Sequence, residues 1–159
     1  MKLSKNFSLE ELIRSDTAER LGIDNIPKDE KVIENLRNLC FEVLQPLRDY
    51  VGAPVVINSG YRCPKLNEAV GGVKTSQHCS GEACDIRLTS SKQGREWAAW
   101  IEDNCRFDQM LLERNKSGAV YTALVWNSKL YLGTNMGLLR ESDDPDSRIF
   151  FDKEEVLQY

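Results

Sequence analysis

The sequence predicts an α+β fold in which helices in the first part of the chain precede an antiparallel sheet. Apolar residues between positions 32 and 47 recur at steps of three and four, the spacing of an amphipathic helix. Short runs rich in branched and aromatic residues, which are typical of strands, lie mostly later in the chain. A length of 159 residues with 41% hydrophobic residues fits one domain over residues 1–159, with a peripheral tail from about residue 136.

Signals for helix ends divide the first 52 residues into three helices. Ser8 is placed to cap the first helix, with Glu11 reaching back from three residues later as in a capping box. Thr17 is placed to cap a second, short helix that ends before Gly22.

A long helix is then predicted to begin at Pro27 and to end at Gly52. Pro46 lies within it and is expected to kink it, because proline has no backbone N–H to donate.

Five strands follow in the prediction, with a helix capped by Ser90 or Ser91 between the second and the third. A tight turn at residues 127–128 joins the last two. The predicted strands cover residues 55–57, 83–87, 107–113, 119–126 and 129–132.

Composition excludes several classes of partner and site. The net charge of −4 and the pI near 5.2 argue against nucleic acid and anionic membranes as partners. No apolar run approaches the roughly 20 residues that span a bilayer. The five cysteines form no CxxC pair, so we expect reduced, mostly buried thiols. His78 is the only histidine, and a site that needs two cannot be built from this chain.

A polar, glycine-rich segment between the first two predicted strands carries the chemistry. His78 and Asp85 are zinc-ligand types that lie seven positions apart, and Gly81 permits a sharp turn between them. Alternation along the strand at 83–87 places Asp85 on one face and Cys84 on the other. We therefore expect Cys84 to be a core residue and not a ligand.

The segment contains SGYR at residues 59–62 and the pattern SxHxxGxAxD at residues 76–85. Together they resemble the signature of the zinc D-alanyl-D-alanine carboxypeptidases of the Hedgehog-type peptidase superfamily, in its small single-domain phage- or prophage-like branch. The similarity extends roughly over residues 5–125. It implies helices packed on one side of the sheet and a cleft for peptidoglycan stem peptides.

The resemblance also assigns roles to individual residues. Arg62 would grip a substrate carboxylate, Ser76 would support the substrate loop, and His78 and Asp85 would bind zinc. Glu113, on the strand that contains the sequence FDQ, would be the general base. Residues 1–7 lack the apolar stretch of a signal peptide, so we expect synthesis in the cytoplasm, with release at lysis if the chain is phage-derived.

One feature of the family is missing from this sequence. The enzymes that it resembles use a second histidine as the third zinc ligand, and Thr122 occupies its aligned place to within one residue. A neutral hydroxyl is a poor zinc donor. Substitute donors remain open: Cys79, Glu113, or a carboxylate of the tail such as Asp143 or Asp144.

Two functions follow from these observations. The first is a zinc metallopeptidase, either carboxypeptidase or endopeptidase, that hydrolyses peptidoglycan stem peptides. The second is a catalytically silent relative that keeps the cleft and binds a wall peptide or a protein partner. The missing ligand favours the second, whereas the presence of Arg62, His78, Asp85 and Glu113 favours the first.

Overall fold

The computed structural model describes residues 1–107, 109–114, 120–125, 136–139 and 149–151, with side chains described as far as residue 107 and at 109, 110 and 112. The helical elements are α1 (Leu9–Ile13), α2 (Asp16–Leu21), α3 (Glu30–Leu39), η1 (Cys40–Leu44), α4 (Gln45–Val51), α5 (Pro64–Ala69), η2 (Gln77–Ser80) and α6 (Ser91–Asn104). Helices come first, as predicted, but the first strand covers residues 57–59 and not 55–57, and two short helical elements, α5 and η2, lie in the glycine-rich segment where none was predicted.

The strands form one sheet in the order β1-β2-β4-β3-β5-β6. The four strands β1 to β4 pair antiparallel, as predicted, whereas β3 and β5 are parallel neighbours. The predicted strand at 129–132 and its turn lie outside the described residues. The strands are β1 (Ile57–Ser59), β2 (Ala83–Arg87), β3 (Gln109–Arg114), β4 (Val120–Val125), β5 (Met136–Leu139) and β6 (Ile149–Phe151).

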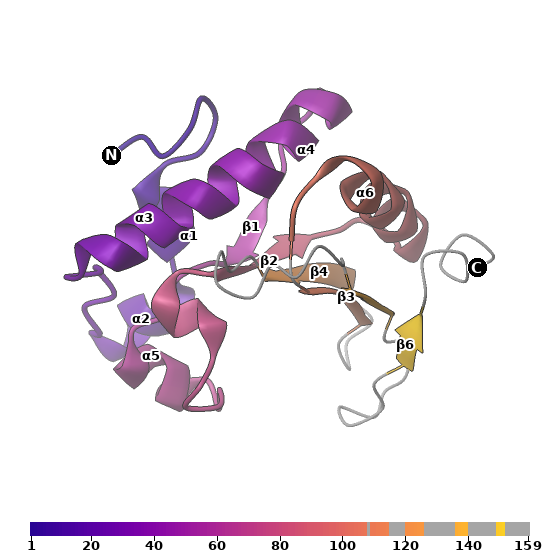
Figure 1. Cartoon of the computed structure of the whole chain (residues 1–159). Coiled ribbons are helices and arrows are strands. Elements are labelled where there is room, and N and C mark those ends of the chain that lie inside the picture. The colour runs from indigo at the N-terminus through magenta and orange to yellow at the C-terminus, as the bar shows by residue number, and fades with distance from the viewer. Residues whose placement is uncertain (108, 115–119, 126–135, 140–148, 152–159) are drawn as a thin grey trace.

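The long helices α3, α4 and α6 lie on one side of the sheet, which confirms the predicted α+β arrangement (Figure 1). The residues of β2 that face this layer, Cys84 and Ile86, have no exposed surface. They join one core with the apolar stripes of the helices. The largest buried side chains of that core include Phe7, Leu12, Leu36, Leu39, Leu44, Leu47, Ile86, Ile101 and Phe107.

The first two helices are short and held by their caps. The Oγ of Ser8 accepts the N–H of Glu11, as predicted. The second cap differs from the prediction, because the Oγ of Ser15 and not Thr17 accepts the N–H of Ala18. Gly22 ends α2 with φ +63°, a conformation that favours glycine.

The long helix is divided where a simple kink was predicted. It begins at Glu30 behind an Asp29 cap, not at Pro27, and it passes through the π-helical turn η1 before Pro46. The N–H of Gln45 donates to the carbonyl of Cys40, five residues back. The wider turn accommodates a proline that has no N–H for the α-helical bond. Gly52 ends α4 as predicted, with φ +63°.

None of the helices in the described part of the chain is long and apolar enough to cross a membrane.

Candidate functional site

The SGYR loop follows β1 and packs directly on the end of α1. The N–H of Tyr61 donates to the carbonyl of Leu12 over 2.8 Å. A Cβ on Gly60 would overlap that carbonyl oxygen, so only glycine permits this approach of the two backbones. The close packing fixes where Arg62 leaves the loop.

Asn25 holds the same loop and was not identified from the sequence. Its side chain, 7% exposed, donates to the carbonyls of Ile13 and Tyr61 over 2.8 and 3.0 Å. Its Oδ1 accepts the N–H of Cys63 over 2.7 Å. These bonds anchor the backbone on both sides of Arg62. Nothing local marks Asn25 in the sequence, because its partners lie 12 to 38 residues away.

His78 lies in the short 3₁₀ turn η2, which Gly81 ends with φ +73°. A Cβ on Gly81 would lie 2.6 Å from the carbonyl oxygen of Val32, so the turn needs glycine for space as well as for conformation. The side-chain amide of Asn35 donates to the carbonyl of Ser80 over 2.9 Å and ties the turn to α3. The chain then enters β2 and reaches Asp85.

Two hydrogen bonds join the His78 turn to the SGYR loop. The Nδ1 of His78 lies 2.7 Å from the carbonyl oxygen of Gly60, and the N–H of Arg62 donates to the carbonyl of His78 over 3.1 Å. Since a carbonyl oxygen only accepts, Nδ1 carries the proton and Nε2 keeps its lone pair. Nε2 lies 3.7 Å from an Oδ1 of Asp85. The structure therefore brings together the two residues that the sequence proposes as ligands.

The environment keeps His78 neutral. Burial lowers its pKa to about 4, and the charge of Arg62 acts in the same direction, while the hydrogen bond to Gly60 opposes them. The His78 side chain is only 11% exposed. A neutral imidazole with one anchored nitrogen and one free nitrogen is the form that binds metals.

His78 and Asp85 fit zinc as two ligands, but the described part of the chain supplies no third. No three side chains of His, Cys, Asp or Glu gather there into a metal site. Catalytic zinc uses three protein ligands and an open position. The side chain of Glu113 and both Asp143 and Asp144 lie outside what the structure describes.

The register of the sheet assigns positions 122 and 123 to different faces. Asp85 on β2 pairs with Ala123 on β4, whereas Thr122 pairs with Ile86. Paired positions of antiparallel strands lie on the same face of a sheet. Position 122 therefore belongs to the face of Ile86, which packs in the core, and position 123 belongs to the face of Asp85. Thr122, the position aligned from the sequence to within one residue, thus lies on the core face, and its neighbour Ala123 lies on the face of Asp85.

Position 113 lies on the same face as Asp85. Arg87 pairs with Tyr121, and Tyr121 pairs with Glu113 on β3. The row that these three positions form is next to the row of Asp85 and Ala123 on that face. The backbone is thus consistent with the expected place of Glu113 on the cleft side of the sheet.

Arg62 lies in the cleft with an incomplete set of partners. One of its terminal nitrogens donates to the Oδ1 of Asn67 over 3.4 Å, while its buried Nε has no partner among the described residues. Asn67 is 3% exposed and also donates to the carbonyl of Val73 over 2.8 Å. A side chain on Gly72 would overlap the Asn67 amide. Gly72 thus leaves room for the side chain that contacts Arg62.

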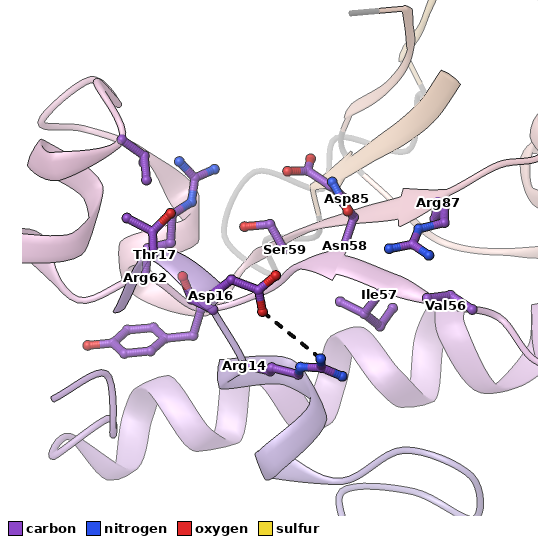
Figure 2. Close-up of a pocket in the computed structure, with 13 residues that line it drawn as sticks. Arg14, Asp16, Thr17, Val56, Ile57, Asn58, Ser59, Arg62, Asp85 and Arg87 are labelled. Atoms are coloured by element: carbon purple, nitrogen blue, oxygen red, sulfur yellow. Dashed lines mark ion pairs between the residues drawn. The ribbon is translucent and has the colours of Figure 1, made fainter. Parts of the chain in front are cut away.

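A cleft of about 670 Å³ opens on this side of the sheet. Figure 2 shows Arg62 on one side of Asp85 and Ser59, and Arg87 on the other. Ser76 does not line the cleft. Its backbone holds the loop, because the Ser76 carbonyl accepts the N–H of Cys79 and the Ser76 N–H donates to the carbonyl of Val73. The lining residues are Arg14, Ser15, Asp16, Thr17, Val56, Ile57, Asn58, Ser59, Tyr61, Arg62, Val70, Asp85 and Arg87.

The thiols form no disulfide and join no group of three metal-ligand side chains in the described part of the chain. All five cysteines are free. Cys84 is fully buried, as predicted, and burial raises its pKa well above the usual range. Cys79 is half-buried, and burial raises its pKa as well. Neither thiol belongs to a group of three possible ligands.

Comparison with known proteins gives the same family as the motifs. The sequence model of the peptidase M15 family matches residues 5–118, which is most of the chain. No curated protein matches it. The matched region contains the SGYR loop, the His78 turn, β2 and position 113, so the family assignment includes the cleft described above. This chain is a member of the peptidase M15 family.

Proposed function

We propose that this protein is a zinc D-alanyl-D-alanine peptidase-like domain that recognises peptidoglycan stem peptides and has an incomplete metal site. The observation that carries the proposal is the geometry of His78, with Nδ1 bonded to Gly60 and Nε2 facing Asp85 across 3.7 Å. Zinc bound there would act as a Lewis acid. Such a metal would be held by His78 and Asp85, and two protein ligands hold it weakly.

Arg62 supports recognition of a peptide by its terminal carboxylate. A guanidinium that is partly buried and has an unpartnered Nε suits a carboxylate, which can accept two parallel bonds. Asn67 and the backbone bonds of the SGYR loop hold the side chain in place before a ligand arrives. Pre-organisation of this kind reduces the entropy that is lost on binding.

A second function, a binding module without hydrolysis, is favoured by one observation. Ala123, which has no donor atom, occupies the β4 position paired with Asp85. A chain that keeps Arg62 but lacks a third ligand at this position would bind the peptide and release it uncut. Glu113 remains the candidate base in the hydrolytic alternative.

Metal content and peptide binding together distinguish the alternatives. Protein purified without chelator would be assayed for zinc and titrated calorimetrically with a peptide ending in D-Ala-D-Ala and with its C-terminal amide. We expect substoichiometric zinc, and binding of the acid that weakens in Arg62→Gln and persists in Arg37→Gln, a matched charge change outside the cleft. Released D-alanine with stoichiometric zinc would establish the hydrolase. Equal binding of acid and amide would refute carboxylate recognition by Arg62.

A further inference from the structure

A second arginine of the cleft is unexplained by recognition of one carboxylate. Arg87 is the last residue of β2 and lines the cleft with an exposed side chain. Its backbone N–H donates to the carbonyl of Val56 over 2.9 Å, which fixes the position of this strand end beside β1. The side chain forms no ion pair with a carboxylate in the described part of the chain.

The charges of the cleft differ from those of the chain. The whole protein carries a net charge of −4, yet three arginines and two aspartates line the cleft. Arg14 is paired with Asp16 across 4.0 Å, and Asp85 faces His78, which is neutral and leaves the negative charge of Asp85 in place. The three arginines and two aspartates give the lining a net charge of +1, and neither Arg62 nor Arg87 forms an ion pair among the described residues. The negatively charged protein repels anions as a whole, so the positive charge of the cleft favours their binding at this place.

The two arginines lie on opposite sides of the candidate metal residue. In Figure 2, Arg62 lies beyond Ser59 on one side of Asp85, and Arg87 lies on the other, with Asn58 between Asp85 and Arg87. A peptide whose terminal carboxylate is held by Arg62 and whose last peptide bond lies near Asp85 would continue toward Arg87. The residues near Arg87 would therefore be those N-terminal to the last peptide bond.

We propose that Arg87 is a specificity residue that binds a second carboxylate of the substrate, on the N-terminal side of the bond near Asp85. The ligand class is a peptide with a free C-terminal carboxylate and an acidic group on the third or fourth residue from its C-terminus. The Asn58 amide, exposed on the same side of the cleft, is a further donor for that group. The inference rests on the proposed function, because it takes the direction of the peptide from Arg62.

Arg14 provides a comparison inside the same cleft. Its charge is offset by Asp16, and both side chains are strongly exposed, at 76% and 92%. Arg87 is exposed as well, so what distinguishes the two arginines is the carboxylate beside Arg14, for which Arg87 has no counterpart in the described residues. Arg14→Gln and Arg87→Gln remove the same charge from the same cleft, and only the second is expected to remove the discrimination.

The test uses two peptides that end in D-Ala-D-Ala. They differ only at the fourth residue from the C-terminus, which is glutamate in one peptide and glutamine in the other. Calorimetry of the full chain is expected to give about tenfold tighter binding of the glutamate peptide, the effect of one charge-assisted hydrogen bond. Arg87→Gln should reduce the difference to about twofold, Arg87→Lys should retain part of it, and Arg14→Gln and Arg37→Gln should preserve it. Circular dichroism confirms that each variant is folded.

The outcomes separate this inference from the proposed function. If the wild type prefers the C-terminal acid over the amide but binds the glutamate and glutamine peptides equally, Arg87 has no such role and the proposed function stands. If Arg14→Gln loses as much discrimination as Arg87→Gln, the effect comes from the general field of the cleft, and the specific role is overturned. If neither peptide binds in an Arg62-dependent manner, both proposals fail.

Discussion

The Nδ1 of His78 lies 2.7 Å from the carbonyl oxygen of Gly60, so the backbone of the SGYR loop orients the imidazole. The same loop places Arg62, whose N–H donates to the carbonyl of His78. The two motifs are thus one structural unit. A change that displaces the loop should disturb the histidine and the arginine together.

Gly60→Ala tests this coupling. The added Cβ would overlap the carbonyl oxygen of Leu12, so we expect a loss of about 1–3 kcal/mol in the free energy of unfolding, the usual range for overpacking. Urea denaturation measures the loss. Gly22→Ala is the matched control, because its Cβ meets nothing within 4 Å and only the φ of +63° opposes it. A smaller loss for Gly60→Ala than for Gly22→Ala would contradict the close approach of Gly60 and Leu12.

Asn25→Ala should destabilise the protein through the same loop. The variant loses three hydrogen bonds and leaves the carbonyls of Ile13 and Tyr61 without the amide that they accept from. At about 1 kcal/mol for each bond, we expect a loss of about 3 kcal/mol. Thermal and urea denaturation, with Asn38→Ala on α3 as a comparison, provide the measurement. A loss below that of Asn38→Ala would show that Asn25 does not anchor the loop.

The pairing of β2 with β4 predicts different zinc affinities for two neighbouring histidine variants. Ala123→His should raise the affinity for zinc, because position 123 pairs with Asp85 and a third ligand completes the site. Thr122→His should not, because position 122 pairs with the core residue Ile86. Competition with a chromogenic chelator measures both affinities.

Cleavage is a separate readout for the restored site. Ala123→His is compared with the double variant Ala123→His, Glu113→Ala on a peptide ending in D-Ala-D-Ala, and only the first is expected to release D-alanine. Tighter zinc binding by Thr122→His than by Ala123→His would show that the register of β2 and β4 is shifted.

The free energy of unfolding should decrease when the pH is lowered, because of His78. Its pKa in the folded state, about 4, lies below its ordinary value of 6.5, so the unfolded chain binds more protons between these values. The stabilisation is therefore present above pH 6.5 and is lost as the pH falls toward 4. With chelator present, we expect wild type to lose up to about 1.4 kcal/mol per pH unit more than His78→Gln in this window. Parallel pH profiles of the two proteins would contradict the shift.

The rate of alkylation should differ between Cys84, on the core face of β2, and Cys79, in the turn that precedes this strand. Cys84 has no exposed surface, and burial raises its pKa well above the usual range, so it should react only when the protein opens. Cys79 is half-buried and should react sooner. Mass spectrometry of peptides after brief treatment of native protein gives the order, and faster modification of Cys84 would place it on the cleft side.

Local features were predictable because the residues that cause them are neighbours in the chain. The Ser8 cap and the glycine ends at Gly22 and Gly52 follow from backbone groups that are left unpaired at helix ends. Alternation within five residues placed Cys84 in the core and Asp85 in the cleft. The choice of Ser15 over Thr17 as the second cap was missed, since both can cap and the helix start depends on packing.

The sequence by itself determined the family, the pairing of His78 with Asp85 and the presence of Arg62 in the loop beside them, because fixed spacings and obligatory glycines encode them locally. Tertiary structure decided what depends on distant partners. The ladder between β2 and β4 placed Ala123 and not Thr122 opposite Asp85, and a shift of one residue in a strand exchanges its two faces. The bonds of Asn25 to the loop and the place of Arg87 in the cleft likewise arise only where segments far apart in the chain meet, and no local pattern carries that information.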